Sequence, residues 1–145
     1  MPSRPRQHRP ARLAIAKADA DRAMEQRRGT AAERGYDSQW RKGRDGFLAK
    51  HPLCAYHALF DPGRIAFAAL VDHLYPHGGD RRLFWLRRYW VGACVNCHSK
   101  HKQAAERRGL AALDELAARL GLPPLSETHP ELVRSARAAL TERRG

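Results

Sequence analysis

The sequence is short of cysteine, of acidic residues and of long apolar runs. Its 145 residues hold three cysteines, and 15 acidic residues face 27 lysines and arginines, which gives a net charge of +12. No apolar run approaches the roughly 18 residues of a membrane span, and no apolar stretch follows the arginines of the N-terminus, so neither a membrane anchor nor a secretory signal is expected. So few cysteines exclude a disulfide framework. We expect a cytoplasmic protein whose first partner is nucleic acid, with an anionic membrane surface as the weaker alternative.

The composition changes along the chain and predicts three parts. Arginine and proline dominate residues 1–10, which we expect to be disordered and able to add phosphate contacts. We expect a basic extension over residues 1–33, a central domain over 34–107 and a helical extension over 108–145.

Capping residues and apolar periodicity predict an α+β arrangement. Ser38 is a suitable N-cap, and Thr128 and Glu131 have the spacing of a capping box. Residues 65–71 are short, apolar and partly β-branched, as in a strand. The predicted elements are helices over 11–28, 38–50, 98–107, 110–120 and 128–143, a strand over 65–71, and a short helix or turn with a brief strand over 84–93.

All three cysteines lie in two short metal-ligand motifs. The first is Cys54-Ala-Tyr-His57 and the second is Cys94-Val-Asn-Cys97. Thiolates and an imidazole at these spacings suit one tetrahedral zinc. We predict a structural zinc on these four residues, although His51 is an alternative fourth ligand.

A second set of metal-ligand residues lies between and beside the two motifs. Asp72 and His73 follow the predicted strand, and His98 directly follows the second motif. A carboxylate and a neutral imidazole leave an open site for a divalent metal, so Asp72 and His98 could hold Mg²⁺, Mn²⁺, Ni²⁺ or Zn²⁺. His73 could then act as a general base, because imidazole titrates near working pH.

Arginines alternate with aromatic residues between positions 81 and 90. This pattern suits DNA binding, although the aromatic rings could instead be core and the arginines merely solvated. We expect Trp85 and Trp90 to be inside and some of the arginines to contact DNA. The residues expected at phosphate or DNA are His77, Arg81, Arg87, Arg88, Lys100 and Lys102.

Several of these motifs together resemble the HNH endonuclease family, nearest to its small phage and prophage members. The resemblance covers residues 34–103. It is carried by Arg34-Gly-Tyr36, Trp40, His51-Pro-Leu-Cys54, Val71-Asp-His-Leu-Tyr-Pro-His-Gly-Gly-Asp80, Phe84-Trp85, Trp90 and Cys94-Val-Asn-Cys-His-Ser-Lys100. It implies a small ββα-metal core stapled by zinc, with helical extensions at both ends. It also implies metal-dependent hydrolysis of DNA, with Asp72 and His98 on the metal and His73 activating water.

Two positions depart from the pattern of that family. His57 stands where most members have a fourth cysteine, and Tyr89 stands where the middle asparagine is usual. The loss of this asparagine supports an alternative, a zinc module that binds DNA and cuts it weakly or not at all. In either case we expect no small-molecule cofactor, and a phage-packaging or other DNA-processing protein is a possible partner.

Overall fold

The computed structural model describes residues 11–144, so the predicted disorder of residues 1–10 lies outside the described residues. It separates a short N-terminal unit, up to Asp37, from a larger unit that begins at Ser38. In the first unit, α1 (Ala11–Arg28) is the predicted helix, and its apolar Ile15 and Met24 are exposed. Among the described helices, none has the length and apolar character that crossing a membrane requires.

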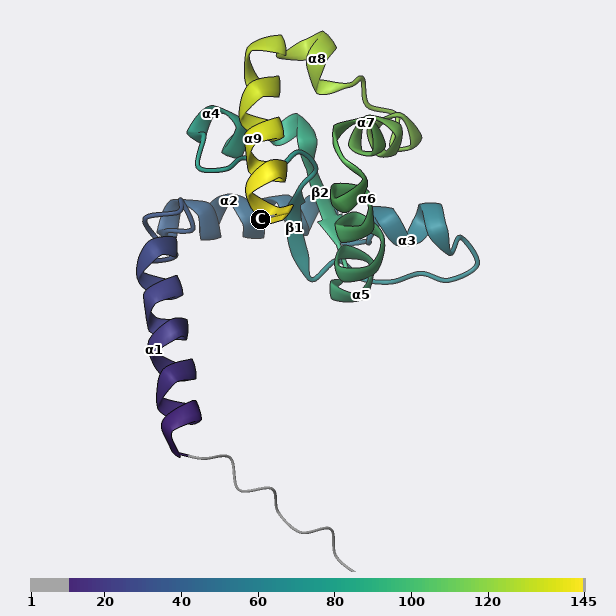
Figure 1. The fold of residues 1–145 in the computed structure, drawn as a ribbon. Coiled ribbons are helices and arrows are strands. Elements are labelled where there is room, and N and C mark those ends of the chain that lie inside the picture. Colours follow the sequence, from purple (N-terminus) through teal and green to yellow (C-terminus); the bar gives the residue numbers. More distant parts are fainter. Residues whose placement is uncertain (1–10, 145) are drawn as a thin grey trace, which may run out of the picture. The chain divides into compact units, whose positions relative to one another are not determined.

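The centre of the larger unit is a two-stranded antiparallel sheet followed by a helical run (Figure 1). Strand β1 (Leu70–His73) pairs with β2 (Trp90–Ala93) so that Asp72 is opposite Val91. The helical run after β2 comprises α5 (Val95–Cys97), the π-helical turn η2 (His98–Lys102) and α6 (Gln103–Arg108). The predicted α+β class is confirmed.

The first strand begins later than the sequence predicted. Only residues 70–73 pair with β2, so Asp72 and His73 lie inside the strand and do not follow its end. Residues 66 and 67 instead pair with residues 53 and 54: an isolated bridge joins Leu53 and Phe67, and the backbone N–H of Cys54 donates to the Ala66 carbonyl at 2.8 Å. The apolar Ile65 and Phe67 that suggested a strand are 80% and 76% exposed. These two apolar side chains are therefore not buried against the sheet, although their hydrophobicity suggested that they would be.

The two faces of the sheet carry different side chains, because neighbouring residues of a strand point in opposite directions. One face packs on α2 (Ser38–Lys50), whose Trp40 forms a cluster with Val71, Phe84 and Trp90. The other face packs on the helical run and the C-terminal helices. Asp72 and His73 consequently lie on opposite faces. Trp90 is buried as predicted, whereas Trp85 is only half-buried.

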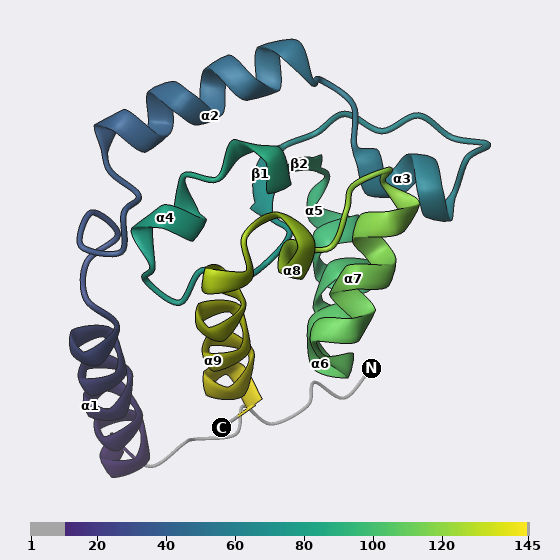
Figure 2. The same cartoon turned by 90° about the horizontal axis from the view of Figure 1, so that it is seen from above.

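The C-terminal helices complete the larger core (Figure 2). Helix α6 contacts both α7 (Leu110–Arg119) and α9 (Val133–Arg144). The predicted capping box at Thr128 is wrong, because Thr128 ends the short helix α8 (Leu125–Thr128) and its hydroxyl donates to the carbonyl of Leu125. The remaining elements are α3 (Ala55–Phe60), α4 (Arg81–Phe84), η1 (Arg87–Tyr89) and η3 (Pro130–Leu132).

Candidate functional site

The three cysteines converge into one cluster. The Sγ atoms of Cys54, Cys94 and Cys97 all lie within 4.8 Å of one another. Cys54 caps α3 and Cys94 caps α5, and each sulfur accepts a backbone N–H three residues on, at 3.3 and 3.4 Å. The helix starts therefore orient both sulfurs toward the same point. The group could bind a metal ion such as zinc.

His57 lies beside this cluster, although it is not within 4.8 Å of all three sulfurs. Its Nδ1 lies 3.4 Å from the Cys97 sulfur, close to the roughly 3.5 Å that separates nitrogen and sulfur ligands of one tetrahedral zinc. Its Nε2 is buried without a hydrogen-bond partner, and the nearest carboxylate oxygen, on Asp61, lies 3.5 Å away. The alternative ligand, His51, is exposed, and its ring stacks on Phe47. The geometry favours His57.

The thiols of Cys94 and Cys97 differ in their protonation. Burial disfavours both thiolates. At Cys94 the backbone N–H of Cys97 and the neighbouring thiols and imidazole outweigh it, so its pKa is lowered. At Cys97 burial and the neighbouring thiols act together and raise the pKa. Cys97 is therefore a thiol in the absence of a cation, and a metal ion that binds the cluster would displace its proton.

Asp72 and His98 meet at the second site. Nε2 of His98 lies 3.3 Å from Oδ1 of Asp72, a separation that two ligands of a single divalent ion can have. Asp72 is 6% exposed, while the His98 side chain is 31% exposed and leaves the site open on its side. The donor types and their separation therefore fit a divalent metal.

Two further residues engage the Asp72 carboxylate, and the sequence analysis missed this role for both. The Tyr56 hydroxyl donates to Oδ2 at 2.5 Å, and Lys102 Nζ lies 3.3 Å from Oδ1 and 3.2 Å from Oδ2. Burial alone would raise the pKa of Asp72, but Lys102, with His98 and Tyr56, lowers it below its usual value. Asp72 is thus held as a carboxylate before any metal binds.

Lys102 was predicted on a DNA-facing surface, and that prediction is wrong. The side chain is fully buried, donates to the backbone carbonyl of His73 at 3.0 Å and contacts Glu106 at 2.7 Å. Glu106 in turn pairs with Arg143 of α9. The sequence spacing could have indicated this burial, because His98, Lys102 and Glu106 recur every four residues and so share one helical face. A buried lysine needs such partners.

His73 lies on the other face of the sheet, in an aromatic pocket. Its ring stacks on Trp40 at 5.1 Å, and its Nε2 lies 3.0 Å from the carbonyl oxygen of Phe84. An Nε2–H that donates to this carbonyl corresponds to the tautomer whose lone pair is on Nδ1. Burial, with the neighbouring His77, lowers the pKa of His73 to about 4. The imidazole is therefore neutral at pH 7, as a general base must be.

The low pKa of His73 predicts that acid destabilises the fold. In the unfolded chain this group has its ordinary pKa of 6.5, so unfolding takes up a proton below that pH. The stabilisation is complete above pH 6.5 and is lost as the pH falls toward 4. Between pH 7 and pH 5 the free energy of unfolding should fall by about 2 kcal/mol more in the wild type than in His73→Phe. Urea denaturation at the two pH values measures this, and equal losses would contradict it.

The other residues predicted at DNA fall into two groups. His77 is half-buried, with its ring 4.8 Å from that of His73, and its Nδ1 accepts the backbone N–H of Gly79 at 3.0 Å. The remaining residues are exposed, and two of them lie over aromatic rings, Arg81 over Phe84 and Arg87 over Trp90. The exposed group comprises Arg81, Arg87, Arg88 and Lys100.

Tyr89, which replaces the expected asparagine, has a structural role. Its side chain is 2% exposed, and its hydroxyl donates to the Pro123 carbonyl at 2.8 Å and lies 2.7 Å from the Thr128 hydroxyl. Its own carbonyl accepts the backbone N–H of Leu74, directly after β1. Tyr89 thus fixes the end of β1 through its backbone and the C-terminal helices through its side chain.

Removing the Tyr89 hydroxyl should therefore lower the stability of the fold and leave any DNA cleavage unchanged. Tyr89→Phe leaves the half-buried carbonyl of Pro123 without this donor, and we expect the free energy of unfolding to fall by about 0.5–1.5 kcal/mol. Urea denaturation checks this value. Any DNA cleavage, measured where both proteins are folded, should be unchanged. An unchanged denaturation midpoint, or cleavage lost without unfolding, would disprove this role.

The chain was compared with protein-family models, characterised proteins and solved structures. No protein-family model, characterised protein or solved structure matches the chain.

Proposed function

We propose that this chain is a metal-dependent DNA endonuclease of the HNH type. One observation carries the proposal: Asp72 and His98, from a strand and from the helical run after the second strand, bring two metal-ligand atoms to 3.3 Å. Neutral His73 is next to Asp72 in the chain, on the opposite face of the strand, where a phosphate at the end of β1 would have to reach both. The order of strand, strand and helix beside a cysteine cluster supports it, as does the net charge of +12. Exposed arginines on the face of Trp90 and Phe84 supply cations for phosphate.

In this proposal each residue of the chain has a distinct role. His73 accepts a proton from the attacking water at Nδ1, while the Phe84 carbonyl holds Nε2–H and so fixes the ring. Lys102 and Tyr56 hold the Asp72 carboxylate in place. A divalent cation on Asp72 and His98, when bound, supplies positive charge to the phosphate and to the departing 3′ oxygen. By the resemblance, the products carry 5′-phosphate and 3′-hydroxyl ends.

A second candidate is a DNA-binding module without nuclease activity, and Lys102 favours it. The ammonium group already lies within 3.3 Å of both carboxylate oxygens of Asp72, where it opposes a second cation. Against this, Glu106 at 2.7 Å offsets the lysine charge. Arg143 also pairs with Glu106, so a metal at Asp72 would have to share this carboxylate with the Lys102 ammonium or displace it.

Plasmid nicking separates the two candidates. Supercoiled DNA is incubated with the protein and Mg²⁺, Mn²⁺ or Ni²⁺ in turn, and His73→Ala is assayed beside the wild type. We expect the wild type to convert supercoiled DNA to nicked or linear DNA with at least one metal, and the variant to be strongly impaired. If both proteins bind DNA and are equally inert with every metal, the enzyme proposal fails.

A further inference from the structure

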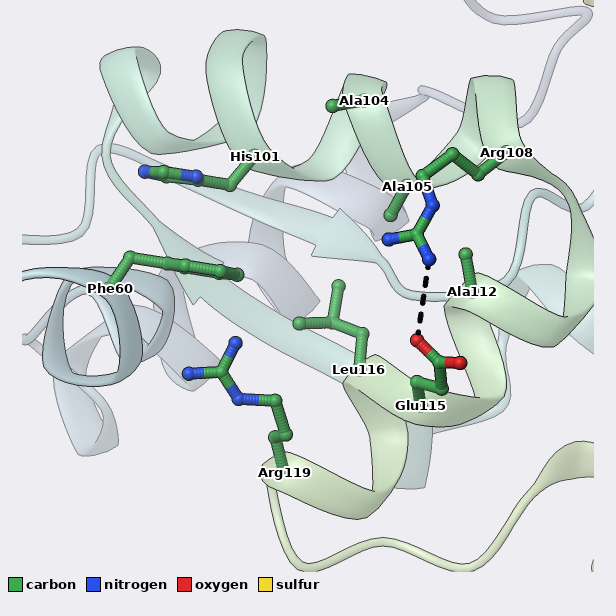
Figure 3. Close-up of a pocket in the computed structure, with 9 residues that line it drawn as sticks. All are labelled: Phe60, His101, Ala104, Ala105, Arg108, Ala112, Glu115, Leu116 and Arg119. Atoms are coloured by element: carbon green, nitrogen blue, oxygen red, sulfur yellow. Dashed lines mark ion pairs between the residues drawn. The ribbon is translucent and has the colours of Figure 1, made fainter.

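A pocket of about 180 Å³ opens between α3, the η2–α6 segment and α7 (Figure 3). This volume is below the roughly 300 Å³ at which sites for whole small molecules begin, so the pocket suits one group of a larger ligand. Its floor consists of alanines with Leu116, and its edge carries two arginines. The residues that line the pocket include Phe60, His101, Ala104, Arg108, Leu116 and Arg119.

One wall of the pocket is aromatic and fixed in place. The rings of Phe60 and His101 stack with centroids 3.9 Å apart and an angle of 3° between their planes. The Arg119 guanidinium lies 4.6 Å from the Phe60 centroid and donates to the Leu59 carbonyl at 3.2 Å. Phe60 is nevertheless 37% exposed. The wall therefore presents ordered ring edges to an incoming flat group.

The cysteine cluster holds the two halves of this wall together. Phe60 ends the helix that Cys54 caps, and His101 follows Cys97 by four residues. Because these cysteines lie within 4.8 Å of each other, the same cluster sets the distance between the helices that carry the rings. The wall is thus formed in advance of any ligand, which lowers the entropic cost of binding.

The charge of the pocket favours an anion. Arg119 and Arg108 both reach its edge from opposite sides, as Figure 3 shows, and the one carboxylate there, Glu115, lies 3.6 Å from Arg108. A flat apolar space with arginines at its edge has the features of sites that bind single nucleotides of a DNA strand.

The position of the pocket relates it to the proposed metal site. His101 is three residues after His98 in the same π-helical turn, η2. His98 lies against Asp72, whereas His101 lies against Phe60. Only this turn of backbone therefore separates the proposed metal site from the pocket in the sequence.

We propose that this pocket binds one unpaired base of a DNA strand, next to the phosphate held near Asp72 and His98. The inference rests on the proposed binding of DNA and adds its location. The base lies over the alanine floor against the edges of Phe60 and His101, and its phosphate contacts Arg119. Such a site reads no particular sequence, because every base is flat.

Binding to two single-stranded oligonucleotides of equal length, one normal and one with abasic residues, tests the proposal. Fluorescence anisotropy is measured without added divalent metal, so cleavage does not interfere. We expect the wild type to prefer the normal strand by about 5-fold, the lower end of what contact with an aromatic ring contributes, because the base meets ring edges. Ala104→Glu, which puts a carboxylate into the pocket, and Arg119→Gln should lose this preference. The matched control Arg137→Gln removes an exposed arginine of α9 and should keep it.

Equal binding of both strands by the wild type, or a preference that survives Ala104→Glu, would overturn the inference. The outcome is separable from the proposed nuclease activity. A protein that prefers the normal strand but nicks no plasmid disproves the enzyme and leaves the base pocket standing. A protein that nicks plasmid but binds both strands equally disproves the base pocket and leaves the proposed nuclease activity standing.

Discussion

Replacing His73 by alanine should slow DNA cleavage by about 10²- to 10⁴-fold, the usual contribution of a general base. The expectation follows from the environment of the ring: it is neutral at pH 7, held by the Phe84 carbonyl and stacked on Trp40. The residual rate would come from a metal at the proposed Asp72–His98 site, whose two ligands the substitution leaves in place. Initial rates of plasmid nicking at saturating metal measure the loss.

Folding and DNA binding must be followed beside the rate, because His73 is 8% exposed and its removal leaves a cavity. His73→Gln retains a polar group of similar size and should be equally slow while folding as the wild type. His51→Ala removes an exposed histidine and should keep the full rate. Cleavage by folded His73→Gln at the wild-type rate would show that another group activates water.

Loss of the zinc ligands should have the largest effect on stability. Structural zinc contributes apparent free energies of about 10–16 kcal/mol in small domains, as much as a whole domain's stability of about 5–15 kcal/mol. Cys97→Ser should therefore unfold the regions around both motifs. Elemental analysis should find one zinc per wild-type chain and none in the variant, and circular dichroism should show the loss of structure.

Two histidine variants identify the fourth ligand of the same cluster. His57→Ala should weaken zinc binding and lower the melting temperature, because its Nδ1 is 3.4 Å from the Cys97 sulfur. His51→Ala should change neither property, because that ring stacks on Phe47. The reverse result would assign the fourth position to His51. A wild-type protein that is stable without any metal would disprove the structural role altogether.

The sequence predicted those parts of the fold that depend on local signals. The helices over 11–28 and 38–50 have the predicted bounds, because capping residues and breakers mark their ends. The strand over 65–71 was misplaced because exposed Ile65 and Phe67 imitate a buried run. The capping box at Thr128 failed because its hydroxyl instead meets Leu125 and Tyr89, a contact between segments far apart in the chain.

For the candidate site, too, the sequence predicted some features and not others. The cysteine spacing predicted the cluster, whereas Asp72 and His73 were expected after the strand and lie within it, on opposite faces. The burial of Lys102 against Asp72 could not be predicted from charge, because a lysine beside other basic residues usually faces solvent. Tertiary packing determines the burial of Lys102, since only the folded sheet brings β1 under the helical run.

Anomalous scattering from crystals grown with Mn²⁺ tests most directly whether Asp72 and His98 form one metal site. The proposed site predicts a manganese peak that contacts Oδ1 of Asp72 and Nε2 of His98, separate from a zinc peak among the three cysteines. It also predicts that Asp72→Asn removes the manganese peak and keeps the zinc. A wild-type crystal with zinc among the cysteines, no manganese at Asp72 and the Lys102 ammonium still on its carboxylate would contradict the proposal.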